Sequence, residues 1–403
     1  MKLLFCLAAL LVLTPGSAEL PNREALFALP NWSTAPGYEP AGTDGIRGIF
    51  YDGLPYHGKP TRVFAWYGKP AGAEEPLPAV ILIHGGGGTA FRYWAALWVK
   101  RGYAVLAMDT NGGVPANNRD SGSDGSIRHP DGGPGLSRIF RDIDLPPQEQ
   151  WPYHAVGAVI RANTLLRSFP EIDPERIGVT GISWGAVIGE LAVSVDSRFR
   201  FAAMVYGCGF LAESSSWSQT EFARLTPKQV ERWTLLWDPA SHLAGNTVPI
   251  LFCNWVSDKH FRPDSWKKTC RLVKPELRHT AYRIRMGHAH PPSGDPPEVA
   301  VFADAMAKNG EPLPRLFSRT SDCAVYTSSV PLKQAELHYT EDAGDWTGRR
   351  WQTAPAALDR ENRTVRAEIP ARATAWFFSI TDSRNCIGTV SYTHLTLPTN
   401  SRV

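Results

Sequence analysis

The chain has 403 residues, of which 43% are hydrophobic and 20% are charged. It is therefore long enough for two or three domains of about 100 to 200 residues, and too apolar to be wholly disordered. The net charge is +3 and there is no long run of Lys or Arg, which excludes the basic surface expected of a nucleic-acid-binding protein.

The N-terminus has the pattern of a secretion signal. Lys2 precedes an apolar run at 3–13, a helix breaker follows at Pro15, and small residues at 16–18 form a cleavage site. This arrangement predicts removal of residues 1–18 and export to the periplasm or the medium. The run is too short to span a bilayer comfortably, so we expect no membrane association after cleavage. A buried N-terminal helix is the alternative.

Short apolar runs alternate with helical patterns over most of residues 19–310. The expected strands are 61–67, 79–83, 104–108, 176–180, 201–206, 249–255 and 281–286. The expected helices are 91–101, 153–169, 186–195, 264–273 and 297–308. Strands that alternate with helices in this way predict an α/β domain with a mostly parallel sheet.

Two long segments interrupt this alternation, at 110–150 and 207–247. The first is rich in Gly, Asp, Asn and Pro, and the second contains Trp217, Trp233 and Trp237. Structureless loops of this length are uncommon unless they cover a functional site. Both follow expected strands, at the sheet edge where ligands bind in open α/β sheets, and we expect them to form a lid and a pocket wall.

The C-terminal part has a different sequence pattern, with short alternating runs and no helical periodicity. After a Pro-rich linker at 311–314, short alternating runs such as 335–339, 364–369 and 374–380 predict a small β-sandwich-like domain at 315–388. Residues 389–403 resemble the in-frame translation of a sequencing adapter, so we expect the last domain to be truncated. A genuine polar tail is the alternative.

Five cysteines remain once the signal is removed, and they do not form a recognisable framework. An odd count at irregular spacing predicts neither a set of disulfides nor a zinc site. Cys323 and Cys386 flank the expected last domain and could pair, whereas Cys208 and Cys253 lie in apolar surroundings typical of buried small residues.

The strongest local signal is the run G-I-S-W-G at 181–185, which separates an expected strand from an expected helix. In a nucleophile elbow the Ser occupies a sharp turn between a strand and a helix, and the flanking glycines allow that turn without a clash. Ser183 is therefore the candidate nucleophile.

The run H-G-G-G-G at 84–88 directly follows the expected strand 79–83. Backbone N–H groups in such a loop can converge on the negative oxygen that develops during acyl transfer. We expect the oxyanion hole to use the N–H groups of Gly86 and Trp184. A phosphate-binding loop is the competing interpretation, but the usual Lys or acidic partner is missing.

A carboxylate and an imidazole follow in the order that this type of site requires. Asp258 lies just beyond strand 249–255, and His288 lies just beyond strand 281–286. The pair His288 and His290 leaves the choice of base open, with His288 preferred because it is nearer the strand. No further ligands with recognisable spacing accompany the pair, so we expect neither a metal nor an organic cofactor.

Two aromatic residues are candidates for substrate binding. Trp151 lies at the start of helix 153–169, and Tyr206 ends strand 201–206. Both sit where a pocket is expected, although a buried aromatic cluster would give the same pattern.

Several further runs resemble a bacterial family of secreted α/β-hydrolases, described as acetyl xylan esterase-like and related to dienelactone hydrolases and prolyl oligopeptidases. They are D-L-P at 144–146, E-Q-W-P-Y-H-A-V at 149–156, V-Y-G-C-G-F at 205–210 and W-D-P at 237–239. The likeness extends over about residues 45–388. It implies an α/β-hydrolase fold and a triad at Ser183, Asp258 and His288. The acid loop departs from the family pattern, because Trp255 stands where Gly is common.

These observations predict a secreted serine esterase that acts on small-molecule or polysaccharide esters. The resemblance adds acetylated or feruloylated plant polysaccharide as an expected substrate, with deacetylation as the expected reaction. A serine peptidase of the prolyl oligopeptidase type and a non-catalytic carbohydrate-binding protein remain alternatives. The acyl group and the oligomeric state are left open by the sequence.

Overall fold

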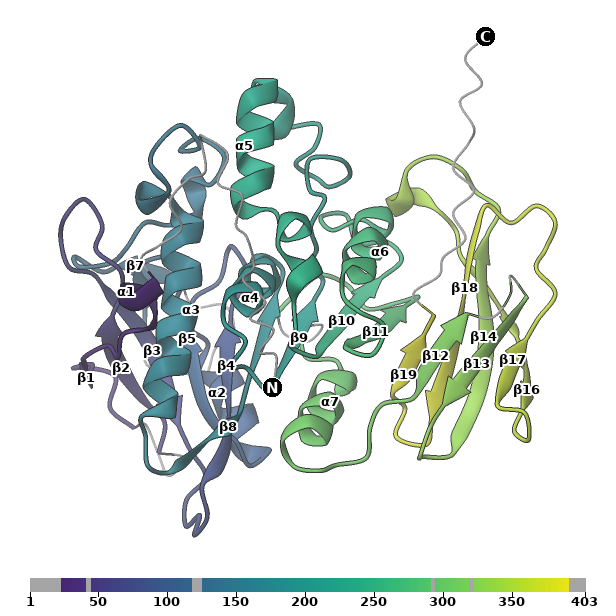
Figure 1. Ribbon diagram of the computed structural model, residues 1–403, viewed down its shortest axis with the longest axis horizontal. Helices are drawn as coiled ribbons and strands as arrows, with labels where there is room; N and C mark the ends of the chain where they lie inside the picture. The colour runs from purple at the N-terminus through teal and green to yellow at the C-terminus, as the bar shows by residue number, and fades with distance from the viewer. Residues whose placement is uncertain are drawn as a thin grey trace, which may run out of the picture.

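A computed structural model of the chain contains a large α/β unit followed by two smaller antiparallel sheets (Figure 1). The structure describes residues 23–40, 45–117, 125–290, 294–318, 320 and 322–390. The expected signal at 1–18 lies outside the described residues, as does the expected adapter-derived tail from residue 391 onward. Among the described residues, no helix is both long enough and apolar enough to cross a membrane.

The large unit is built on one nine-stranded sheet. Six neighbouring strands are parallel, whereas the strands at the N-terminal edge are antiparallel. The predicted mostly parallel α/β sheet is therefore confirmed. In spatial order the strands are β1 (Trp32–Thr34), β2 (Arg47–Asp52), β3 (Arg62–Gly68), β5 (Ala104–Met108), β4 (Leu77–Ile83), β8 (Ile172–Ile182), β9 (Phe201–Val205), β10 (Ile250–Trp255) and β11 (Arg278–Arg283).

Helices cover both faces of this sheet because its central strands are apolar on both sides. In β4, Ile81 and Ile83 contribute to the core on one face, and Val80 and Leu82 contribute to the core on the other. The first face packs against α1 (Arg23–Phe27), α3 (Trp151–Arg167), α4 (Trp184–Val195), α5 (Pro227–Trp237) and α6 (Pro263–Leu272). The second packs against α2 (Arg92–Lys100) and α7 (Pro297–Ala307).

The segment 207–247 corrects one expectation from the sequence. It is not a structureless lid, because it contains α5, and Trp233 and Trp237 are buried in the main core. The helix starts at a capping box in which Thr226 and Gln229 each accept a hydrogen bond from the other's backbone N–H. The T-x-x-Q spacing is a sequence signal for a helix start that was overlooked.

The last strand of the sheet lies three residues earlier than expected. Its first residues, Arg278, His279 and Thr280, are polar and read as a loop, yet they pair in register with β10. The polar side chains are tolerated because β11 adjoins the C-terminal unit, where the Thr280 hydroxyl donates to the Thr389 carbonyl at 2.8 Å. This neighbour is distant in sequence and could not be read from the local pattern.

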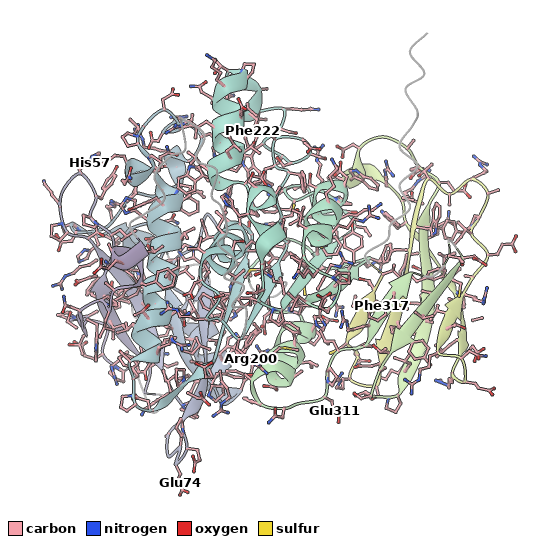
Figure 2. The ribbon with its side chains drawn as sticks, viewed as in Figure 1. His57, Glu74, Arg200, Phe222, Glu311 and Phe317 are labelled. Carbon is pink, nitrogen blue, oxygen red and sulfur yellow. The ribbon has the colours of Figure 1, made fainter. Side chains whose placement is uncertain are left out.

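The C-terminal unit comprises two four-stranded antiparallel sheets that share a small apolar core. One sheet contains β12 (Arg315–Ser318), β13 (Cys323–Thr327), β17 (Thr364–Arg366) and β16 (Ala357–Asp359). The other contains β15 (Gln352–Pro355), β14 (Leu332–Thr340), β18 (Ala375–Asp382) and β19 (Ile387–Thr389). Figure 2 labels Glu311 in the segment that leads into this unit, and Phe317 on β12.

The unit is attached to the α/β unit by specific contacts. The Phe377 ring lies 5.1 Å from that of Tyr282, and the Ile387 N–H donates to Glu298 Oε1 at 2.8 Å. Cys323 and Cys386 are both buried free thiols, so the pairing considered from the sequence is wrong. The predicted domain boundaries at 19–310 and 315–388 remain an interpretation.

Candidate active site

Ser183 occupies the sharp turn between β8 and α4, with φ +56° and ψ −123°. A non-glycine residue is uncommon at positive φ, and the strain is typical of a functional turn. A Cβ on Gly181 would lie 2.2 Å from the Gly185 carbonyl oxygen, and one on Gly185 would lie 2.2 Å from the Ile83 carbonyl oxygen. Gly181 is therefore required for the close approach of α4 to β8, and Gly185 for the close approach of α4 to β4.

Gly185→Ala is expected to destabilise the fold by about 3 kcal/mol or more, because the new methyl group would collide with backbone carbonyls that β4 holds in place. Chemical denaturation measures the loss. Gly87→Ala is the matched control, since a Cβ there has no atom within 4 Å; its cost should stay below about 1 kcal/mol. Equal losses in the two variants would contradict this packing argument.

The structure brings Ser183, His288 and Asp258 together from three separate strand ends. The Ser183 Oγ lies 2.9 Å from His288 Nε2, and His288 Nδ1 lies 2.7 Å from Asp258 Oδ2. Because an ionised carboxylate only accepts hydrogen bonds, Nδ1 carries the proton and Nε2 is free to accept from the serine hydroxyl. This is the arrangement that a serine nucleophile and its base require.

Asp258 is fully buried, and both of its oxygens have partners. Oδ1 accepts from the backbone N–H groups of His260 and Phe261, each at 2.8 Å. Oδ2 accepts from His288 and from the indole N–H of Trp255 at 3.2 Å. These four donors offset the desolvation cost of a buried carboxylate.

His290 lies apart from this chain of hydrogen bonds. Its ring packs against the rings of Phe91 and Trp94, each 4.6 Å away, and its Nδ1 is hydrogen-bonded to the Tyr93 hydroxyl. Burial, with a smaller contribution from His84, lowers the pKa of His290 to about 3. The geometry therefore favours His288 over His290 as the base.

The glycine loop at 84–88 lies directly against the nucleophile turn. A Cβ on Gly85 would lie 3.2 Å from Ser183 Cβ, and one on Gly86 would lie 2.7 Å from Trp184 Cδ1. Within the part of the chain that the structure describes, the N–H groups of Gly86 and Trp184 donate to no protein acceptor. Both donors are thus available for an oxyanion beside Ser183.

Residues that directly follow strand β5 hold the glycine loop in place by hydrogen bonds. His84 Nε2 accepts from the Thr110 N–H at 3.0 Å, and the Asn111 side chain donates to the Gly86 carbonyl at 3.1 Å. Asp109 accepts from the Asn111 N–H at 2.8 Å. Sequence reasoning missed Asp109 and Asn111, although polar residues directly after an apolar parallel strand are a usable signal.

The two predicted substrate-binding residues are buried. Trp151 is 2% exposed, and its indole donates to the Thr110 carbonyl at 2.6 Å. Tyr206 is fully buried, its ring lies 4.2 Å from that of His288, and its hydroxyl donates to the Ala289 carbonyl at 2.6 Å. The structure gives both residues positioning contacts, so their role in substrate binding stays a prediction without support.

Trp217 and His260 form a half-buried aromatic surface beside the triad that sequence reasoning did not single out. Their rings are stacked 5.5 Å apart, and the His260 ring lies 4.9 Å from that of His288. Ser216 Oγ lies 2.9 Å from His260 Nδ1. Burial and the neighbouring His288 lower the pKa of His260, so its ring is neutral at neutral pH.

Part of the chain matches a known family model. Residues 49–221 match the family model described as acetyl xylan esterase (AXE1), a range that includes Ser183 and ends before Asp258 and His288. A search of the curated proteins finds no match.

Three solved structures are similar to this chain, and the first two illustrate the likeness in fold. Acetyl xylan esterase from Paenibacillus sp. R4 is 23% identical, with a TM-score of 0.52 over 67% of this chain and 88% of that one. Acetyl xylan esterase 1 from Thermoanaerobacterium sp. JW/SL YS485 is 18% identical, with a TM-score of 0.54 over 71% and 91%. An acylaminoacyl peptidase from Pyrococcus horikoshii is 18% identical, with a TM-score of 0.46 over 63% and 39%. The predicted α/β-hydrolase fold and the family resemblance are confirmed.

Proposed function

We propose that this chain, a serine carboxylic ester hydrolase with the α/β-hydrolase fold, removes acetyl groups from plant polysaccharide such as xylan. The observation that carries the proposal is the continuous chain of hydrogen bonds from Ser183 through His288 to Asp258, next to two N–H groups that have no acceptor among the described residues. The match to an acetyl xylan esterase family supports the choice of acyl group.

The reaction follows from these positions. Ser183 Oγ attacks the acyl carbonyl carbon while its proton passes to His288 Nε2, and Asp258 stabilises the imidazolium that results. The tetrahedral oxyanion accepts hydrogen bonds from the Gly86 and Trp184 N–H groups. Collapse releases the sugar hydroxyl, which takes its proton from His288. Water then attacks the acyl-enzyme by the same route and releases acetate.

Two features near the triad support hydrolysis of a sugar ester. Gly86, a proposed oxyanion donor, lies in direct contact with Leu136 and Trp184, since a Cβ there would lie 2.4 Å from Leu136 Cδ2 and 2.7 Å from Trp184 Cδ1, so its N–H is held beside the nucleophile turn. The half-buried Trp217 ring, stacked on His260, offers a flat surface of the kind on which sugar rings pack. Export through residues 1–18 belongs to the same proposal, because the polymer lies outside the cell.

Release of acetate from acetylated xylan by the purified protein tests the proposal. We expect acetate release and, on feruloylated xylan as the matched polymer with a bulky acyl group, a rate at least about tenfold lower. Prolyl amides and unmodified xylan are included in parallel. Cleavage of prolyl amides without acetate release would assign a peptidase, and binding of xylan without turnover would assign a carbohydrate-binding protein. Either result would overturn the proposed function.

A further inference from the structure

Trp255 contacts the triad carboxylate at a position where the resembling family commonly has glycine. It is the last residue of β10 and lies three residues before Asp258. Its indole Nε1–H donates to Asp258 Oδ2 at 3.2 Å, the same oxygen that accepts from His288 Nδ1 at 2.7 Å. Two donors therefore share one carboxylate oxygen.

The backbone around Trp255 is fixed by a neighbouring amide. Asn254 is fully buried, its Oδ1 accepts from the Trp255 N–H at 2.8 Å, and its Nδ2 donates to the Phe261 carbonyl at 2.9 Å. The next N–H, of Val256, donates to the Arg283 carbonyl on β11 at 3.0 Å. These bonds close the loop that carries Asp258 and fix the backbone from which the indole extends.

We propose that Trp255 is a positioning residue that tunes the basicity of His288 by sharing Asp258 Oδ2 with it. The inference rests on the proposed triad. A carboxylate oxygen that already accepts from an indole has less charge to offer to an imidazolium. Loss of the indole N–H therefore strengthens the attraction between Asp258 and protonated His288, and makes His288 a stronger base.

The other titratable groups near His288 do not account for a change in its basicity when Trp255 is replaced. Burial and the neighbouring His288 lower the pKa of His260, which favours its neutral form. Burial also raises the pKa of Tyr206, which stays a neutral phenol. Lys259, the neighbouring cation, is exposed to solvent and is therefore screened. Asp258 remains the carboxylate partner of His288, and Trp255 is the side chain that modulates it.

The pH dependence of kcat/KM for a small acetyl ester tests the proposal with Trp255→Phe. The acid limb reports the base of the free enzyme, and we expect its midpoint to rise by about half a pH unit in this variant. Trp266→Phe is the matched control, since the Trp266 indole on α6 is buried and its Nε1 has no partner within the described structure. Its acid limb should coincide with that of the parent protein.

An unchanged or lowered midpoint in Trp255→Phe would overturn the proposal, because a merely structural role lowers kcat/KM by the same factor at every pH. If Trp255→Phe does not fold, the same pH profile is measured with benzothienylalanine at position 255, which keeps the ring shape and removes only the N–H donor. A raised midpoint of the acid limb is again the expected result, and an unchanged or lowered midpoint again overturns the proposal. Ser183→Ala is measured alongside. Activity retained in Ser183→Ala would defeat the proposed function, whereas its loss together with an unshifted Trp255→Phe midpoint would defeat this inference alone.

Discussion

Replacing Ser183 with alanine is expected to lower kcat/KM for acetyl esters by roughly 10⁴- to 10⁶-fold, the largest effect that we expect from any single substitution. The hydroxyl is the only part of the side chain that reacts, and its oxygen is 2.9 Å from the imidazole that would accept its proton. The turn itself is set by the backbone and the flanking glycines, so folding should be preserved. Steady-state hydrolysis of an aryl acetate measures the loss.

Ser216→Ala is the matched control for this result. Its hydroxyl lies near the triad, 2.9 Å from His260 Nδ1, and is not joined to His288. Its removal should change kcat/KM by less than about fivefold. Comparable losses in the two variants would show that the site depends on its general packing and would contradict the assignment of Ser183 as nucleophile.

His288→Ala is expected to lower kcat/KM by a similar factor of roughly 10⁴ or more, because no other imidazole contacts Ser183 Oγ among the described residues. Two other imidazoles of this region are His260, which is hydrogen-bonded to Ser216, and His290, which is enclosed by aromatic rings. Neither is placed to take the proton. Stopped-flow acylation with an activated ester separates this chemical step from substrate binding.

His290→Ala completes the comparison between the two histidines. It removes a buried ring from the Phe91 and Trp94 contacts, so stability should fall by about 1 to 3 kcal/mol while the kcat of the folded fraction changes less than about tenfold. Thermal unfolding and active-site titration measure the two quantities. A loss of 10⁴-fold in His290→Ala, with His288→Ala active, would reverse the assignment of the base.

Part of this site was readable from the sequence because its geometry is local. The strained turn at Ser183 and the glycines at 181 and 185 are consecutive in the chain, and the collisions that exclude larger residues involve the same turn and its neighbouring strand. Asp258 and His288 could be predicted from order alone, since parallel strands bring their carboxyl ends to one edge.

Other features depend on residues that meet only in the folded chain. Trp217 and His260 are 43 positions apart in the numbering and stack beside His288, and neither carries a sequence pattern that marks a site. Trp151 and Tyr206 were expected to face the substrate, yet both are enclosed by segments that follow other strands. Trp233 and Trp237 were expected in a lid and lie in the core, because α5 turns them toward the sheet.

The sequence by itself therefore determined the α/β alternation, the nucleophile turn and the order of the triad candidates, because these follow from hydrophobic periodicity and from backbone sterics within a few residues. Only the tertiary structure joined His288, and not His290, to Ser183 and Asp258, gave Asp258 its indole donor from Trp255, and placed polar β11 against the C-terminal unit. Those outcomes depend on which side chains meet between strands that are far apart in the chain. Burial and the pairing of buried polar groups favour one set of contacts over another only once the sheet has brought those side chains together.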